Sequence, residues 1–547
     1  MAGKTIADDL ANKHKSISIA EFFEKNRHLL GFDSKIKAML TCVKEAVDNS
    51  LDACEEYASE QKKRKKEFEL PDILVRVDLI QGEVYKVIVE DNGPGLVASI
   101  IPKVFAKLLY GSKFHRLKQG RGQQGIGISA SVLYGQLTTG KPTRIISKVS
   151  KDRPAQIVEL VIDIKKNDAS ILRNEEYARF SKDHGTRVEI ILEGTYRATG
   201  EKSIFEYLKR TSISNPHAKI TFIDPAGKMT IFKRAAESLP LETKEIKPHP
   251  WGLELGVLTR MIEETKKTTI KSFLTDELSK VGSTTAKQIL KKIKVNLKRR
   301  PDSIKTEEAV ELIKELQKAD LQRPPIDCLS PVGRGAIEKS LKIEFQPEFM
   351  AATTRAPNVY RGYPFQVEAA LAYGGNIPEG NAQVLRVANK VPLLYESGAC
   401  AITIATNEMD WKRYGIPKNS SSSVPTAPII IFVHVCSVWV PFTSESKAAI
   451  ANYPIIIKEI KLALQECARQ LGVFIKKKMR IKKDAQRINT FIKYSEILAS
   501  SLATLSRKDE KEIKTLMNEI LEKKYGEALK KKEETIKKEA KLTTKKD

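Results

Sequence analysis

The sequence lacks any stretch of about 18 or more consecutive apolar residues, so we expect no membrane-spanning helix. Its beginning, MAGKTIADDLANKHKS, has no apolar segment of the kind that directs export, which favours a cytoplasmic protein. Cysteine is scarce: six occur in 547 residues, and no two have the CxxC spacing of a zinc site. Several of the scattered cysteines lie in apolar segments, which predicts buried thiols in a reducing compartment and argues against a disulfide framework.

Acidic residues are too few to balance the basic ones. There are 94 lysines and arginines against 68 aspartates and glutamates, which gives a net charge of +26. This excess predicts a polyanionic partner, nucleic acid first and an anionic membrane surface second, and charge alone does not separate the two. A length of 547 residues, 41% of them hydrophobic, predicts a globular protein of about two to four domains.

A P-loop is also missing, since no GxxxxGK[ST] pattern occurs. A different glycine-rich stretch, GRGQQGIG at residues 120–127, leads into a helical segment. Free backbone N–H groups and the helix dipole favour phosphate at such a position. Lys113 and Arg121 add positive charge, and Gln123 and Gln124 add amide donors. Such a loop is by itself a weak indication of phosphate binding.

The segment KEAVDNSLD at residues 44–52 places Glu45, Asn49 and Asp52 on one face of a helix. Apolar residues between Ile36 and Cys54 recur with a period of about 3.6 and form a separate stripe. The helix is therefore expected to bury its apolar side and to present a carboxylate and an amide outward. An ordinary solvated helix would show the same pattern.

Two alternating segments, ILVRVDL and VYKVIVE, predict a hairpin that runs into DNGPG at residues 91–95. Gly93 and Gly95 flank a proline in a tight turn, which lets a ligand approach the backbone closely. Asp91, at the strand end, is placed to accept a hydrogen bond from an exocyclic amine. A later strand opens with Gly185 and Thr186, and the Thr186 hydroxyl is a candidate to assist that carboxylate. Plain turns and strand starts have similar sequences.

The order of these motifs resembles that of the GHKL ATPases, which include gyrase-type topoisomerases, Hsp90, MutL and histidine kinases. The resemblance implies the Bergerat nucleotide fold, an α/β sandwich. It implies that Glu45 is the general base for the attacking water, that Asn49 is a Mg²⁺ ligand, and that Asp91, assisted by Thr186, reads adenine. It also implies that the glycine loop (residues 120–127) closes over the triphosphate. The ATP-binding residues predicted in this way are Asn49, Asp91, Gly93, Gly95, Ser112, Lys113, Gly120, Arg121, Gly122, Gln123, Gln124, Gly125, Ile126, Gly127, Thr186 and Lys447.

Residues 231–312 predict a basic helical insert. Between Glu277 and Asp302 there are eight basic residues and no acidic ones, a composition suited to phosphate contacts without sequence reading. A solvated basic helix is an equal alternative for this segment alone. The segment resembles the helix-two-turns-helix insert of the B subunits of type IIB DNA topoisomerases (topoisomerase VI). The residues predicted to contact DNA here are Lys287, Lys291, Lys292, Arg299 and Arg300.

Residues 313–470 resemble the transducer domain of the same B subunits, with an α/β layer built on long apolar strands. The stretch PFTSESK follows one such strand, and the sequence predicts a helix directly after it. By resemblance, Lys447 in this stretch reaches the γ-phosphate. Trp411, Lys412 and Tyr414 resemble a motif implicated in DNA contact. His434, within an apolar strand, is expected to be a core residue.

The resemblance extends over nearly the whole chain and predicts a multidomain α/β protein. The predicted parts are residues 1–230 (ATPase domain), 231–312 (basic insert), 313–470 (transducer) and 471–547 (C-terminal stalk helix and Lys/Glu-rich tail). It implies the ATPase subunit of a type IIB topoisomerase that uses ATP and Mg²⁺ and dimerises when ATP binds. Its partners would be duplex DNA and a DNA-cleaving A subunit, together a heterotetramer, and its location would be the nucleoid of an archaeal-type cytoplasm.

Two alternatives stay open at this point. One is a clamp of the mismatch-repair or chaperone type within the same superfamily, which the basic insert and the PFTSESK stretch disfavour. The other is a DNA-binding scaffold that uses ATP only as a switch. Glu45 disfavours the scaffold, because a chain that does not hydrolyse ATP has no need of a general base.

Overall fold

The computed structural model describes residues 10, 14, 17–111, 116–122, 125–419, 422, 424–520 and 523. These residues fall into two compact units. The first contains the residues up to Met409 together with Asn419–Cys467, and the second contains Asp410–Lys418 and the residues from Ala468 onward. The first unit holds every element that surrounds the site described below.

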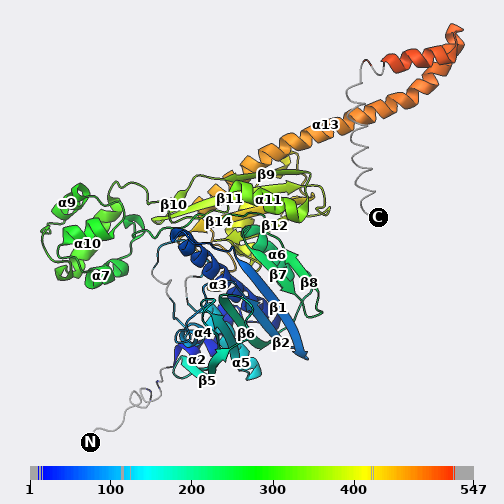
Figure 1. The fold of residues 1–547 in the computed structure, drawn as a ribbon. Coiled ribbons are helices and arrows are strands. Elements are labelled where there is room, and N and C mark those ends of the chain that lie inside the picture. The colour runs from blue at the N-terminus through cyan, green and yellow to red at the C-terminus, as the bar shows by residue number, and fades with distance from the viewer. Residues whose placement is uncertain are drawn as a thin grey trace, which may run out of the picture. The chain divides into compact units, whose positions relative to one another are not determined.

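The N-terminal part of the first unit is an eight-stranded sheet covered by helices (Figure 1). The strand order is β5-β4-β3-β6-β2-β1-β7-β8, and neighbours are antiparallel except β1 and β7. Its strands are β1 (Asp72–Gln81), β2 (Val84–Glu90), β3 (Thr143–Lys148), β4 (Ala155–Asp163), β5 (Asp168–Tyr177), β6 (Gly185–Glu193), β7 (Lys219–Ile223) and β8 (Met229–Phe232). Its helices are α2 (Ile19–Lys25), η1 (Arg27–Leu30), α3 (Lys35–Lys63), α4 (Ile101–Ala106), α5 (Gly127–Thr139) and α6 (Ile204–Ser214).

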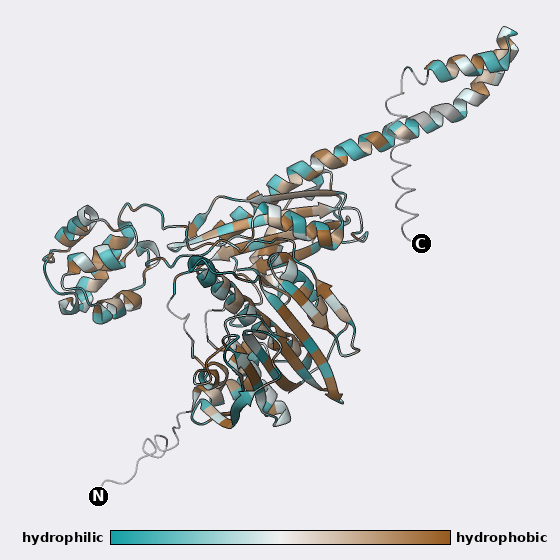
Figure 2. Ribbon diagram, in the orientation of Figure 1, coloured by the Kyte–Doolittle hydropathy of each residue, from teal (hydrophilic) through white to brown (hydrophobic). Residues whose placement is uncertain are grey.

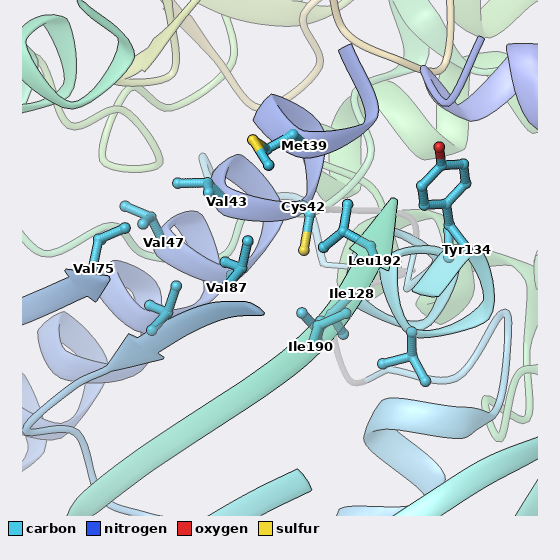
Figure 3. Packing of buried hydrophobic residues seen from close by; sticks show 14 of the residues in the cluster. Met39, Cys42, Val43, Val47, Val75, Val87, Ile128, Tyr134, Ile190 and Leu192 are labelled. Carbon is cyan, nitrogen blue, oxygen red and sulfur yellow. The ribbon is translucent and has the colours of Figure 1, made fainter. Parts of the chain in front are cut away.

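Helix α3 is the central helix of this layer. The side chain of Ser34 caps it by accepting a hydrogen bond from the Lys37 N–H. Its apolar stripe is buried as the sequence predicts. Figure 3 shows Met39, Cys42, Val43 and Val47 packed with residues of the sheet and of α5. The opposite face is thereby turned toward the nucleotide motifs.

Strand β5 is an element that the sequence did not predict. It forms the edge of the sheet beside β4, and its side chains are almost all exposed. Because it buries no face, its sequence DASILRNEEY shows no alternation of apolar and polar residues, which is the pattern by which strands are found.

The basic insert is a small helical cluster with its own apolar core. It consists of η2 (Pro250–Gly252), α7 (Leu255–Glu264), α8 (Ile270–Glu277), α9 (Ser283–Lys292), η3 (Pro301–Ser303) and α10 (Thr306–Lys318). The turn between α8 and α9 contains Gly282, which occupies the N-cap position of α9. The helix–turn–helix order predicted for this segment is therefore confirmed.

The transducer part of the first unit is built on a second sheet, of six strands, in the order β10-β11-β14-β12-β13 with β9 beside β11. The strands are β9 (Phe349–Thr354), β10 (Asn358–Tyr360), β11 (Tyr363–Tyr373), β12 (Gln383–Ala388), β13 (Val391–Pro392) and β14 (Ile429–Ser437). The helices are α11 (Arg334–Phe345), η4 (Ser397–Ala399) and α12 (Ala401–Asn407). Hydrophobic residues follow the strands of both sheets (Figure 2).

The second unit contains η5 (Trp411–Tyr414) and most of α13 (Pro454–Ser506), which begins in the first unit. The sequence predicted a helix directly after Lys447, but residues 448–453 are not helical. The physical reason is Pro454: proline is favoured in the first turn of a helix and disfavours helical backbone in the residue before it. Among the described residues, no helix is long and apolar enough to cross a membrane. All six cysteines are buried free thiols, as predicted.

Candidate nucleotide-binding site

One cavity of about 540 Å³, here called the central cavity, gathers most of the predicted nucleotide residues. They come from α3, from the turn after β2, from the glycine loop, from the start of β6 and from the segment 445–448 that follows β14. Of the predicted residues, those that line it are Glu45, Asn49, Asp91, Gly95, Gly122, Gly125, Ile126, Gly127, Thr186 and Lys447. Gly93, Gly120 and Arg121 do not line it, and Ser112, Lys113, Gln123 and Gln124 lie outside the described residues.

Glu45 reaches the cavity wall from α3 with a lysine directly beside it. Lys44 Nζ donates to Glu45 Oε1 at 2.8 Å. Burial disfavours ionisation of Glu45, but the charges of Lys44 and Lys447 outweigh it and lower the pKa of that carboxyl. The two lysines thus favour the ionised carboxylate, which is the form that a general base needs before it takes a proton.

Two further polar residues support this pair, and neither was predicted from the sequence. Asp48 Oδ2 lies 3.7 Å from Lys44 Nζ, and Asp48 Oδ1 accepts from the Tyr207 hydroxyl at 3.1 Å. Burial raises the pKa of Asp48, although Lys44 opposes the shift. Tyr207 comes from α6, far along the chain, so no local pattern signals the contact.

Asp91 is held by three donors. Its Oδ1 accepts from the backbone N–H groups of Gly93 at 2.9 Å and Thr186 at 3.1 Å, and its Oδ2 accepts from the Ser50 hydroxyl at 2.8 Å. Burial raises the pKa of Asp91, while these donors stabilise the ionised form. A carboxylate has about four lone-pair positions, so Oδ2 retains one for a further donor from a ligand. Gly93 thus acts on Asp91 and does not face the cavity.

The glycine loop is crowded at Gly127 and open at Gly122. A Cβ atom at Gly127 would lie 1.8 Å from Glu45 Oε2, so any other residue here would displace that carboxylate from its present position. Gly125 adopts φ +61°, a left-handed conformation that favours glycine. A Cβ at Gly122 would meet only Asn49 Oδ1, at 3.8 Å, across the cavity. The glycines are thus required where the loop approaches the catalytic candidate.

Arg121 directs its guanidinium away from the cavity and pairs with carboxylates of α3. It donates to Asp52 Oδ1 at 2.7 Å, to Glu55 Oε1 at 2.5 Å and to the Asn215 side chain. Burial opposes the charge of Glu55, but Arg121 and His217 hold its pKa well below the usual range. The sequence assigned the Arg121 charge to phosphate, whereas the structure places it in this buried network.

Lys447 reaches the cavity from the transducer part of the first unit. Its Nζ donates to the Arg121 carbonyl oxygen at 2.9 Å. Burial lowers the pKa of Lys447, and the Glu45 carboxylate opposes that shift. Its backbone has φ +53°, which is uncommon for a residue with a Cβ. Lys447 thus lines the same cavity as Glu45, although 402 positions separate the two in the numbering.

The residues predicted to contact DNA differ in how available they are. Lys287 and Lys291 are exposed on α9, whereas Lys292, Arg299 and Arg300 pair with Glu315, Glu308 and Asp302 at 3.0, 2.6 and 2.7 Å. Lys412 is exposed and Tyr414 is half-buried. Trp411, by contrast, is fully buried, so the prediction that its indole contacts DNA does not fit this structure. His434 is a buried core residue, as predicted.

Comparison with known proteins agrees with this arrangement. The family model described as Histidine kinase-, DNA gyrase B-, and HSP90-like ATPase matches residues 34–194, which include Glu45 to Thr186. The model described as Topoisomerase VI B subunit, transducer matches residues 324–487, which include Lys447. The B subunit of the type 2 DNA topoisomerase 6 of Methanococcoides burtonii is 46% identical over 517 residues, 94% of this chain and 81% of that protein. This chain belongs to the family of type 2 DNA topoisomerase 6 B subunits.

Two more topoisomerase 6 B subunits show how widely the likeness extends. The protein of Archaeoglobus fulgidus is 44% identical over 512 residues, 94% of this chain and 83% of that protein. The protein of Pyrococcus horikoshii is 36% identical over 566 residues, 95% of this chain and 97% of that protein. The predicted family and the predicted fold class, a multidomain α/β protein with a GHKL ATPase fold and a transducer, are therefore confirmed.

Proposed function

We propose that this chain is the ATP-driven clamp of a heterotetrameric type IIB DNA topoisomerase. Two copies dimerise when ATP binds and trap a duplex, and the cycle drives that duplex through a break made by a DNA-cleaving A subunit. The result is relaxation of supercoils and decatenation. The observation that supports this most is that the ATPase motifs and Lys447 of the transducer line one cavity. The four-part division at residues 230, 312 and 470 belongs to this proposal, although β8, α10 and α13 each cross one of its boundaries.

In this scheme ATP occupies the central cavity with adenine at Asp91. The free lone pair of Asp91 Oδ2 accepts from the exocyclic amine, and the Thr186 backbone keeps the carboxylate oriented. The open part of the glycine loop, from Gly122 onward, lies along the phosphates with its N–H groups. Glu45 accepts a proton from the attacking water, and its ionised state in this structure suits that task.

Asn49 is the candidate ligand for Mg²⁺. Its side chain lines the cavity with the amide oxygen close to Gly122, and within the described part of the chain it has no hydrogen-bond partner. An amide oxygen is a ligand that Mg²⁺ accepts, and Mg²⁺ commonly takes one or two protein ligands besides phosphates and water. The residues therefore fit the ion. When bound, it would neutralise charge on the phosphate oxygens.

Lys447 is proposed to exchange its contact with the Arg121 carbonyl for the γ-phosphate. Lys447→Ala should lower ATP turnover by about a hundredfold, because one positioned donor to developing charge is lost. Strand passage should fall with it. Steady-state hydrolysis and supercoil relaxation, with the exposed Lys458→Ala as control, measure both effects. Unchanged hydrolysis and passage in Lys447→Ala would remove Lys447 from the mechanism.

The basic insert is proposed to contact DNA phosphates through those of its lysines that form no ion pair with any residue that the structure describes. The double variant Lys287→Glu/Lys291→Glu should weaken DNA binding at every sequence alike and lower the slope of log affinity against log salt by about 1 to 2. The matched control, Lys339→Glu/Lys342→Glu on α11, changes the net charge equally at two exposed positions. DNA-stimulated ATPase at several salt concentrations is the measurement. An equal effect of both double variants would mean that only net charge matters.

The whole proposal is tested by relaxation of a supercoiled plasmid. Relaxation should require this chain, the A subunit and hydrolysable ATP together. Relaxation without ATP would contradict the ATP-driven clamp, and relaxation by this chain alone would contradict the division of labour with an A subunit.

A further inference from the structure

The turn between β12 and β13 consists of two residues with unusual backbone. Ala388 pairs with Val391, so Asn389 and Lys390 alone form the loop, with φ +47° and +67°. A two-residue hairpin turn with both residues left-handed favours Asn followed by Gly, and a lysine in the second position is strained. Both residues are only 5% exposed. Such a conformation persists only where its surroundings hold it firmly.

The side chain of Asn389 joins the glycine loop to the end of β14. Its Oδ1 accepts from the Ser437 N–H at 2.9 Å, and its Nδ2 donates to the Ser437 carbonyl at 2.9 Å. The same Nδ2 donates to the Gly120 carbonyl at 3.3 Å. Ser437 is the last residue of β14, and the segment after it carries Lys447.

The start of the glycine loop is fixed by several other contacts. Gln119 makes two hydrogen bonds with the Ser330 backbone, at 3.1 and 2.7 Å. Lys390 Nζ donates to the Ser330 hydroxyl at 2.9 Å. Arg121 is anchored to α3, as described above. Gln119, Gly120 and Arg121, here called the loop root, are therefore hydrogen-bonded to Ser330, to the turn between β12 and β13, and to α3.

Lys390 connects the same turn by hydrogen bonds to the ATPase part and to the transducer part of the first unit. Its carbonyl accepts from the Ser214 hydroxyl at 2.8 Å and from the Asn215 side chain at 3.0 Å, at the end of α6. Its N–H donates to His434 Nε2 at 3.0 Å, and His434 Nδ1 bonds to the buried Glu368 carboxylate at 2.8 Å. The turn thus lies in a continuous buried polar network that extends from the ATPase helices into the transducer sheet.

We propose that Asn389 is a positioning residue that couples the glycine loop to the transducer by a route separate from Lys447. The inference rests on the proposed ATP-driven function. Lys447 lies in the cavity and exchanges partners with the nucleotide, whereas Asn389 and Gly120 lie outside it and keep their bond. A shift of Gly120 on nucleotide binding is transmitted through its carbonyl to Asn389, then to Ser437 and the segment that carries Lys447.

The test uses Asn389→Gly, which keeps the left-handed backbone and removes only the amide. The matched control is Gln346→Gly, an exposed amide residue of the transducer at φ +43°, remote from the loop. With the A subunit and supercoiled DNA, Asn389→Gly should bind a non-hydrolysable ATP analogue within about twofold of the unchanged chain. Its strand passages per ATP should fall by about fivefold or more, the scale of a typical coupling between two sites.

A second variant and a second readout guard against a merely structural effect. Asn389→Asp keeps the acceptor for Ser437 N–H but turns an oxygen toward the Gly120 carbonyl, and it should uncouple in the same way. Hydrogen exchange on addition of the analogue should change at residues 120–127 in every variant, and at 437–447 only in the unchanged chain and Gln346→Gly. A lower melting temperature with unchanged passages per ATP would overturn the inference. If the unchanged chain with the A subunit shows no ATP-dependent strand passage, that result contradicts the proposed function itself and not only the role of Asn389.

Discussion

Glu45→Gln should reduce ATP turnover by about a thousandfold while nucleotide binding stays within about threefold, because a positioned general base contributes about 10² to 10⁴ in rate. Glutamine keeps the size of the side chain, so its fit beside Gly127 and its contact with Lys44 Nζ are retained. What is lost is the ability to take the proton of the attacking water. Single-turnover hydrolysis and equilibrium binding of a non-hydrolysable analogue separate the two effects.

The control for this prediction lies on the same helix. Glu56 is exposed on α3 and does not line the central cavity, so Glu56→Gln removes an equal charge without touching the site. Dimerisation on ATP binding should persist in Glu45→Gln, since it depends on binding and not on cleavage. Turnover within about tenfold of normal would show that the base is elsewhere, because such a loss is smaller than a general base supplies. If the unchanged chain itself hydrolysed almost no ATP, the result would favour the alternative of a DNA-binding scaffold that uses ATP only as a switch.

The contrast between Glu45 and Arg121 shows what sequence reasoning can reach in this chain. Glu45, Asn49 and Asp91 occur in motifs whose order is informative, and the structure gathers all three around one cavity. Arg121 lies in such a motif too, but its charge is taken by Asp52 and Glu55. No local pattern reveals that pairing, since the arginine and the carboxylates are more than 60 residues apart.

The unpredicted residues share a physical cause. Ser50 lies among apolar residues of α3 and gains its role from Asp91, 41 positions later. Asn389 bonds to Gly120 across 269 positions, and its turn lacks the glycine that normally marks such a hairpin. Helix and strand patterns record which face is buried, so they gave α3 and most strands. They do not predict which polar groups form hydrogen bonds or ion pairs once those faces are packed, and the site depends on these contacts.

Asp91→Asn should weaken nucleotide binding by at least about a hundredfold in affinity, because neither orientation of the new amide satisfies both the turn and the ligand. If the new amide nitrogen takes the position of Oδ1, it faces the N–H groups of Gly93 and Thr186, donor against donor. If it takes the position of Oδ2, the Ser50 hydroxyl can turn to accept from it, but the exocyclic amine of adenine then meets a donor. The first orientation removes hydrogen bonds that hold the turn, and the second removes the hydrogen bond to the ligand.

Base specificity gives the sharper measurement of the same residue. The unchanged chain should bind ATP far more tightly than inosine triphosphate, which has a carbonyl in place of the amine, because a buried carboxylate left without its donor is costly. Asp91→Asn should lose most of the preference for ATP over inosine triphosphate. Ser50→Ala removes one supporting donor, so it should weaken binding of ATP by about tenfold but retain the preference. The melting temperature of each variant checks the fold. Equal binding of the two nucleotides by the unchanged chain would place adenine away from Asp91, whatever the variant does.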